Sequence, residues 1–161
     1  MKIKGLLDED FLNYKKPSMF IEFPYCTFKC DKEAGCTICQ NSDLANAPDI
    51  DVQIEDVLKR YIDNPITKAI VLGGLEPLDS VFDVITLIDT LRNKYNNEDD
   101  IVIYTGYNKP EVLEMPVYAD IKRYKNIIIK FGRFIPNKDS IVDEVLGVKL
   151  ASNNQFAERI S

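Results

Sequence analysis

The stretch from Met19 to Asn41 reads M-F-I-E-F-P-Y-C-T-F-K-C-D-K-E-A-G-C-T-I-C-Q-N and contains all four cysteines of the chain. Its first five residues have the apolar, aromatic-rich composition and the length of a buried β-strand. The cysteines follow directly, at Cys26, Cys30, Cys36 and Cys39. We expect a short loop at the end of the strand to bring the thiols together, and metal chemistry is the first hypothesis for this loop.

Several kinds of chemistry compete for the cysteine cluster. Closely spaced thiols in a chain without an apparent secretion signal are more often metal ligands or redox groups than disulfides. A structural zinc site prefers two cysteine pairs about 12 to 20 residues apart, whereas only five residues separate Cys30 from Cys36. A thioredoxin-like pair, Cys36-Thr-Ile-Cys39, would leave Cys26 and Cys30 without a role. An iron–sulfur cluster uses thiolates gathered in an irregular loop, and we favour it.

Two segments of this loop are similar to the halves of a known motif. Cys26-Thr-Phe-Lys-Cys30 matches the first half of C-x-x-x-C-x-x-C, and Cys36-Thr-Ile-Cys39-Gln-Asn41 matches its second half with the Asn that often follows. The chain thus resembles a small radical S-adenosylmethionine (SAM) enzyme, specifically the activating protein of the anaerobic, glycyl-radical ribonucleotide reductase. Six additional residues separate the halves. Cys26 and Cys39 are therefore assigned as ligands, while Cys30 and Cys36 compete for the third place.

The resemblance continues beyond the cysteine loop. The segment Gly73-Gly74-Leu75-Glu76-Pro77 resembles the family's G-G-E-P motif, and Ile103-Tyr104-Thr105-Gly106-Tyr107 resembles the T-G-Y that ends its third strand. Near the end of the chain, Lys130–Phe134 and Leu150–Gln155 resemble the G-x-F and S-x-N-Q stretches. The resemblance to this family therefore spans nearly the whole chain.

This resemblance implies a cofactor arrangement. Three thiolates would hold three irons of a [4Fe–4S] cluster, and SAM would bind the fourth through its amino and carboxylate groups. Gly73 and Gly74 would let the backbone approach the methionyl end of SAM, and Glu76 would accept from its ammonium, although two glycines after a strand also suit a plain turn. The cofactor-binding residues expected on this basis are Ile38, Asn41, Gly73, Gly74, Glu76 and Thr105. Lys130 and Arg133 would meet the SAM carboxylate or the solvent.

The resembled family also implies the target and the partners. The activase would abstract hydrogen from a glycine of a large glycyl-radical ribonucleotide reductase subunit, and a flavodoxin- or ferredoxin-type protein would supply electrons. One alternative is a radical SAM protein that activates another glycyl-radical enzyme or modifies a peptide. From a different class, the chain could be a non-enzymatic iron–sulfur or zinc-binding module.

Composition narrows the function further. The 161 residues, 45% of them hydrophobic, predict one domain over residues 1–161. The chain has no histidine, which excludes Cys/His zinc fingers and His-based hydrolases. A net charge of -6 argues against nucleic-acid binding. No apolar run approaches the roughly 20 residues that span a bilayer, so we expect a cytoplasmic protein that does not bind membranes.

The hydrophobic pattern predicts an α/β fold with a mostly parallel sheet. Strands that alternate with helices imply right-handed βαβ units, and ligands bind beyond the carboxyl ends of such strands. The cysteine loop, Gly73-Gly74 and Thr105-Gly106 all follow predicted strands. The family resemblance implies a shortened, partial (β/α) barrel, and residues 1–18 receive no catalytic role. The predicted strands are Met19–Phe23, Thr67–Leu72, Ile101–Thr105 and Asn126–Phe131, and the predicted helices begin near Asp51, Leu78 and Asn108.

Overall fold

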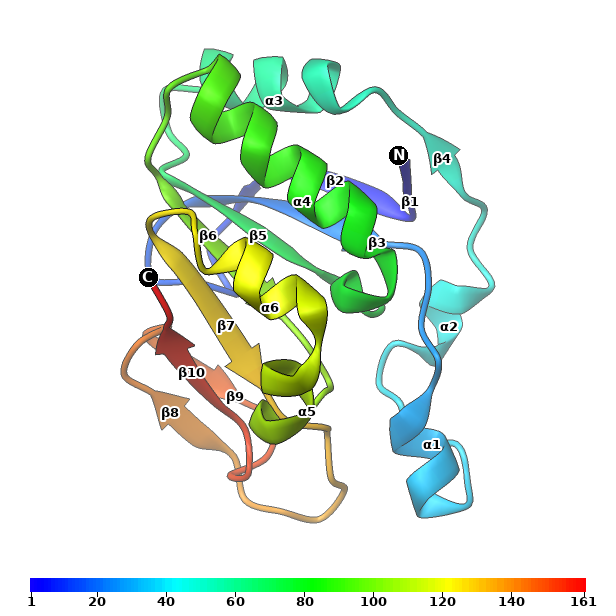
Figure 1. Cartoon of the computed structure of the whole chain (residues 1–161). Helices are drawn as coiled ribbons and strands as arrows, with labels where there is room; N and C mark the ends of the chain where they lie inside the picture. Colours follow the sequence, from blue (N-terminus) through cyan, green and yellow to red (C-terminus); the bar gives the residue numbers. More distant parts are fainter.

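In the computed structural model, which describes residues 1–161, the chain is built on one six-stranded sheet (Figure 1). Four strands run parallel in the middle, and one antiparallel strand flanks them at each edge. The mostly parallel α/β fold is therefore confirmed as a single domain. In the order β2-β3-β5-β6-β7-β10, the strands are Gly5–Asp10, Ser18–Phe23, Ala69–Gly74, Asp100–Tyr104, Ile127–Phe131 and Phe156–Arg159.

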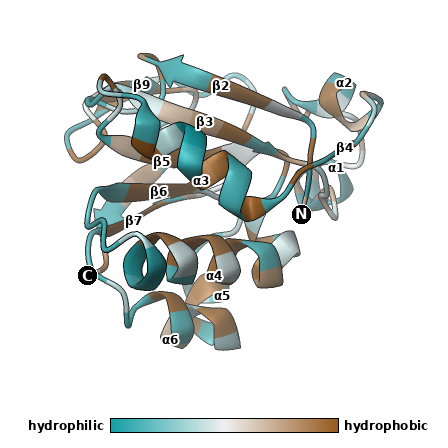
Figure 2. Cartoon of the chain, turned by 90° about the horizontal axis from the view of Figure 1, so that it is seen from above, coloured by the Kyte–Doolittle hydropathy of each residue, from teal (hydrophilic) through white to brown (hydrophobic).

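The central strands are apolar at consecutive positions because both faces of the sheet are covered. Ile70 and Leu72 of β5 pack into the larger of two core clusters, and their neighbours Ala69 and Val71 pack into the smaller one. Successive side chains of a strand point to opposite faces, so one apolar run supplies both cores. In Figure 2 the strands β5 and β6 are largely hydrophobic, whereas the outer surface of α3 (Ile54–Asp63) is hydrophilic.

The two faces of the sheet are covered differently. Helices α3 to α6 all pack into the larger cluster, and Figure 1 shows α4 and α6 in front of the strands. The other face is covered by Tyr14, Leu146 and Leu150, the last of which belongs to the β8–β9 hairpin. The remaining bounds are Val81–Asp89 for α4, Lys109–Glu114 for α5, Pro116–Ile121 for α6, Ile141–Asp143 for β8 and Val148–Leu150 for β9.

The first 18 residues, for which the sequence indicated no catalytic role, contribute to the sheets. They form the edge strand β2 and the short strand β1 (Lys2–Ile3), which pairs with β4 (Ile50–Asp51). This pairing explains a difference from the predicted structure. The helix expected from near Asp51 begins at Ile54, because the residues before it are held in extended conformation by β1.

The other helices also differ in detail from the prediction. The long amphipathic helix expected from Leu78 to Leu91 is divided into a 3-10 turn (Pro77–Ser80), α4 and a π-helical turn (Thr90–Lys94). The short helix expected after Asn108 is confirmed as α5, with proline in its first turn. Within all 161 residues, no helix combines the length and apolarity that a membrane crossing requires.

Residues 24–45, here called the cysteine segment, are partly helical, where the sequence predicted an irregular loop. The segment contains α1 (Lys29–Ala34) and α2 (Ser42–Ala45), which Figure 1 shows to one side of the sheet. The sheet ends at β2 and β10, which do not pair with each other. The partial barrel implied by the family resemblance stays a prediction.

Candidate metal centre

A cavity of about 380 Å³ opens at the carboxyl ends of the parallel strands. Small-molecule sites typically enclose about 300–1,000 Å³, so the cavity has the size of a ligand site. Its walls come from the cysteine segment, the end of β5, the turns after β6 and β7, and β9. The crevice expected from the alternation of strands and helices is therefore present, and the cysteine segment forms one of its sides.

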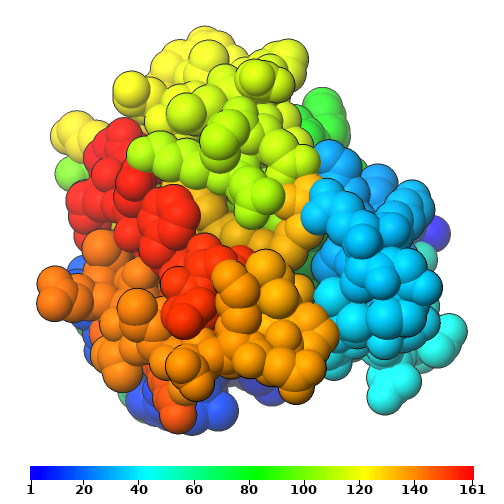
Figure 3. Space-filling view, turned by 90° about the horizontal axis from the view of Figure 1, so that it is seen from below, coloured from blue at the N-terminus to red at the C-terminus, as the bar shows by residue number.

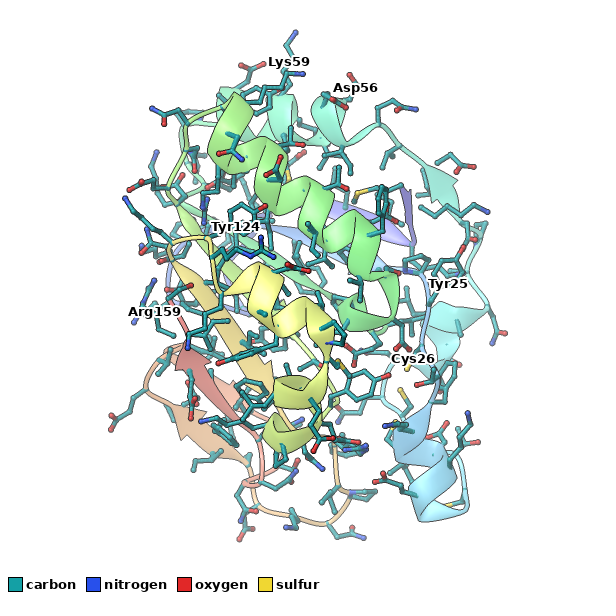
Figure 4. All side chains as sticks on the ribbon, viewed as in Figure 1. Tyr25, Cys26, Asp56, Lys59, Tyr124 and Arg159 are labelled. Atoms are coloured by element: carbon teal, nitrogen blue, oxygen red, sulfur yellow. The ribbon has the colours of Figure 1, made fainter.

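Three of the four thiols line this cavity. They belong to Cys26, Cys30 and Cys39, all partly buried, whereas Cys36 is exposed and does not line it. All four cysteines are free, so no disulfide staples the segment. Figure 4 shows Cys26 on the stretch that leads from β3 to α1. The two residues that the sequence left in competition are thus separated in space, with Cys30 at the cavity and Cys36 outside it.

The spacing of the thiols bears on which metal group they fit. A zinc site gathers about four ligands on one ion, and no group of three or more Cys, His, Asp or Glu residues in the chain is close enough to share an ion. A [4Fe–4S] cluster binds each thiolate to a different iron, so its ligands lie further apart. The three cavity thiols fit this donor set and would leave one iron without a protein ligand.

Two of the cavity thiols, those of Cys26 and Cys30, have raised pKa values. Burial raises the pKa of Cys26 to about 12, opposed by the Phe28 amide that donates to its Sγ at 3.2 Å. The nearby Glu76 carboxylate raises this pKa further. Burial and the neighbouring Cys39 thiol also raise the pKa of Cys30. Metal ligation requires thiolates, so binding must release the protons of these thiols.

Polar contacts tie the cysteine segment to the ends of the strands. The amide of Thr27 donates to Asp79 Oδ2 at 2.7 Å, and the Tyr107 hydroxyl donates to Asp79 Oδ1 at 2.6 Å. On the other side, Asn41 Nδ2 donates to the carbonyl oxygen of Gly74 at 2.6 Å. These contacts fix both ends of the segment next to β5 and the turn after β6.

Asp31 organises the segment from within. Its Oδ1 accepts hydrogen bonds from the amides of Ile38 and Cys39, both at 2.9 Å. This contact holds the end of the segment against α1, which carries Cys30. Ile38 itself does not line the cavity, so the structure gives no support for its predicted packing against a cofactor there.

Three buried charged side chains line the cavity, the acidic Glu76 and the basic Lys130 and Arg133. Glu76 is 5% exposed and accepts from the amides of Leu78 at 3.1 Å and Gly106 at 2.8 Å. Burial nevertheless raises its pKa to about 7. Lys130 is 7% exposed, donates to the carbonyl oxygen of Gly132 at 3.0 Å, and has its pKa lowered to about 8 by burial. The cavity can therefore offer both an acceptor and a donor away from bulk water.

One of the two glycines of the G-G-L-E-P segment has a structural reason that the sequence did not indicate. Both belong to β5, and Gly74 has a φ of +79°. A Cβ on Gly74 would lie 2.8 Å from Glu22 Cα, and one on Gly73 would lie 2.8 Å from Phe20 Cζ. Close packing against the backbone of β3 and the positive φ thus require glycine at position 74, whereas a side chain at position 73 would meet only the end of the Phe20 ring. The expected reason, space for a ligand, is not needed to explain Gly74.

Most of the predicted cofactor-binding residues line the cavity. Thr105 is one of them, and its Oγ1 accepts a hydrogen bond from the Tyr107 amide at 3.0 Å, which closes the turn after β6. Asp79 and Asp31 were missed, because a single aspartate in a short helix or helical turn carries no distinctive sequence signal. Lys130 had a signal, since it is the one charge in a buried strand. The predicted cofactor-binding residues that line the cavity are Asn41, Gly73, Gly74, Glu76 and Thr105.

An α/β sheet with three cysteines at a strand-end cavity defines an iron–sulfur class of protein. A family model described as a 4Fe-4S single cluster domain matches residues 18–155, which is most of the chain. The chain therefore belongs to the 4Fe-4S single cluster domain family, which is associated with radical SAM proteins. No curated protein and no solved structure matches the chain.

The position of each thiol predicts which cysteines are needed for the cluster. Replacing Cys26, Cys30 or Cys39 by Ala should abolish assembly of a [4Fe–4S] cluster, because each change removes one of three ligands. Cys36→Ala should retain it. Cluster assembly is measured after anaerobic reconstitution by the iron and sulfide content and by the visible absorption band. Full loading of Cys30→Ala together with loss in Cys36→Ala would contradict the geometry.

The raised pKa of Glu76 predicts how stability depends on pH. Its pKa is 4.5 when unperturbed and about 7 in the fold, so the folded state holds this proton more tightly than the unfolded state. The contribution of Glu76 to stability is then full below pH 4.5 and falls as pH rises through 7, by about 3 kcal/mol at about 1.4 kcal/mol per pKa unit.

The comparison that isolates this effect is between the metal-free chain and its Glu76→Gln variant. Both proteins are unfolded with urea at a series of pH values. Their free energies of unfolding should diverge between pH 4.5 and 7, because the variant becomes more stable relative to the parent as pH rises. Glu111 offers a control of opposite sign, since Arg133 lowers its pKa to about 2. Parallel curves for the chain and Glu76→Gln would show that Glu76 ionises normally.

Proposed function

We propose that the protein is a radical SAM enzyme that cleaves SAM reductively and generates a glycyl radical on an anaerobic ribonucleoside-triphosphate reductase. In this proposal Cys26, Cys30 and Cys39 hold the [4Fe–4S] cluster, and residues 1–161 act as one activase-like domain. The observation that carries the proposal is that three thiols and buried side chains of both charges share one strand-end cavity.

The charged side chains suit the amino-acid end of SAM. Lys130 Nζ has three N–H donors and uses one on the carbonyl oxygen of Gly132, so two remain for a carboxylate. Each Glu76 oxygen accepts one amide and retains capacity for an ammonium. Because both groups are buried, charge-assisted hydrogen bonds to them are stronger than at a surface. Asn41 and Thr105 add polar contacts at the cavity wall.

The chemistry itself would come from the cofactors. A bound [4Fe–4S] cluster and SAM would together supply one-electron cleavage of a carbon–sulfur bond of SAM, with methionine and 5′-deoxyadenosine as products and a glycine Cα of the target as the source of the hydrogen. The protein binds SAM by its charged end and limits access of water. A flavodoxin- or ferredoxin-type donor would supply a new electron to the cluster for each cleavage. A location in the cytoplasm is part of the same proposal.

The dimensions of the site favour a protein substrate. A volume of about 380 Å³ lies at the lower end of the range for ligand sites, so SAM would leave little room for a second small molecule. Four parallel strands with helices on the face opposite the smaller core also suit a shortened barrel whose open side a partner could cover. A glycine-bearing loop of a large subunit is the substrate that we infer.

Lys130 gives the sharpest test of SAM binding. Lys130→Met keeps the length and apolar character of the side chain but removes the buried ammonium, so SAM affinity should fall about 10-fold or more, as expected for a lost charged hydrogen bond of about 1.5–3 kcal/mol. Lys149→Met is the matched control, because Lys149 also lines the cavity but is exposed. Equal SAM affinity in both cluster-loaded variants would remove Lys130 from the site.

The activase function is tested with the partner protein. The reconstituted chain, mixed anaerobically with SAM, a reductant and an anaerobic reductase, should give a glycyl radical by electron paramagnetic resonance, and its 5′-deoxyadenosine yield should rise with added partner. Cys39→Ala should give neither. Rapid 5′-deoxyadenosine formation with a peptide or metabolite, and no radical on any reductase, would leave only the broader radical SAM function.

A further inference from the structure

Helix α1 carries Cys30, yet the helix has no packing of its own against the core. None of its six residues is buried, and its N-terminus at Phe28 (φ 51°) has no side-chain cap. A helix this short is not stable in isolation. The position of Cys30 relative to the cavity must therefore depend on polar contacts between α1 and the rest of the fold.

Those contacts come from two residues that flank Cys30. Lys29 Nζ lies 2.9 Å from Glu111 Oε1, and Glu33 Oε1 lies 3.0 Å from Arg133 Nη2. Lys29 and Glu33 are four positions apart and so share one face of α1. Their partners lie on α5 and in the turn after β7. Figure 3 shows the cysteine segment bordering the segment that follows β7.

The centre of this arrangement is an ion pair between the buried Arg133 and the half-buried Glu111. The Arg133 side chain is 7% exposed and makes two hydrogen bonds to the Glu111 carboxylate, of 2.7 and 2.8 Å. Such forked, charge-assisted pairs are strong and fix geometry, whereas the more exposed contacts of Lys29 and Glu33 contribute little alone. We call Lys29, Glu33, Glu111 and Arg133 the α1 clasp.

Arg133 has two further features that relate it to the metal centre. It lines the cavity together with Cys30, and it pairs with Glu33 of the helix that carries Cys30. Its Nε is buried and has no hydrogen-bond partner. An unpaired buried donor is costly, and the sulfur atoms of a cluster bound at Cys30 would bring acceptors to this region.

We propose that Arg133, held by Glu111, is the positioning residue that seats Cys30 at the cluster and places a positive charge beside it. The clasp makes Cys30 rather than Cys36 the third ligand, and the guanidinium favours the reduced, more negative cluster. This inference rests on the cluster ligands of the proposed function but does not require SAM cleavage. Charge and hydrogen bonding near the sulfur atoms are established determinants of cluster potential.

The reduction potential and the cluster lifetime test this role. In the reconstituted full chain, Arg133→Gln should shift the midpoint potential to a more negative value and speed loss of the cluster to a chelator about 10-fold or more, as for other residues that orient metal ligands. Arg133→Lys keeps the positive charge but loses the paired hydrogen bonds to Glu111. The midpoint potential of the cluster in this variant should therefore lie near that of the parent, while loss of the cluster to the chelator stays fast.

Arg159→Gln is the matched control, because Arg159 also pairs with a carboxylate, that of Asp100 at 2.8 Å. Figure 4 shows Arg159 on the opposite side of the molecule from Cys26, so this change should leave the potential unaltered. Should Arg133→Gln not fold, Glu33→Gln replaces it in the lifetime test, because that side chain is 60% exposed. It should show a smaller acceleration.

A double variant tests the choice of ligand. Cys36→Ala should have no effect on cluster content in the parent chain, but it should remove the cluster that remains in Glu111→Gln, where a loosened α1 lets Cys36 substitute for Cys30. An unchanged potential in Arg133→Gln, or an equal effect of Cys36→Ala in both chains, would overturn the proposal. Failure to cleave SAM, with these results intact, would instead count against the proposed function.

Discussion

The parallel pairing of β3, β5, β6 and β7 is the constraint on which the site depends. In the ladder Phe23 lies opposite Gly74, Leu72 lies opposite Ile103, and Tyr104 lies opposite Lys130. All four carboxyl ends therefore reach one edge of the sheet. Groups that are distant in the sequence meet there because each follows its own strand.

The metal centre and the sheet are held by different forces. The strands are fixed by apolar side chains that are fully buried on both faces, whereas the cysteine segment is seated by hydrogen bonds and ion pairs. Polar contacts at the surface are weak one by one and depend on geometry, so the segment can respond to what it binds. Coupling of this kind, in which ligation completes the local fold, is common in metal sites.

The parts held by apolar packing could be predicted from the sequence, whereas the parts held by polar contacts could not. A short run of consecutive apolar residues, such as Ile127 to Ile129, is typical of a strand that is covered on both faces. The parallel sheet could therefore be predicted. That Cys30 lines the cavity and Cys36 does not could not be predicted, because the helix that carries Cys30 contacts Glu111 and Arg133, which are far along the chain. Likewise, the reason for Gly74 is visible only when β3 lies beside β5.

We propose that SAM binds in the strand-end cavity with its amino-acid end at the iron that lacks a protein ligand. Electron–nuclear double resonance of the reduced cluster, with SAM labelled with ¹⁵N at its amino group and ¹⁷O at its carboxylate, tests this directly. The account predicts hyperfine coupling from both labels, and loss of the coupling when unlabelled SAM displaces them. A reduced [4Fe–4S] cluster with three cysteine ligands that shows no coupling from either label at saturating SAM would contradict it.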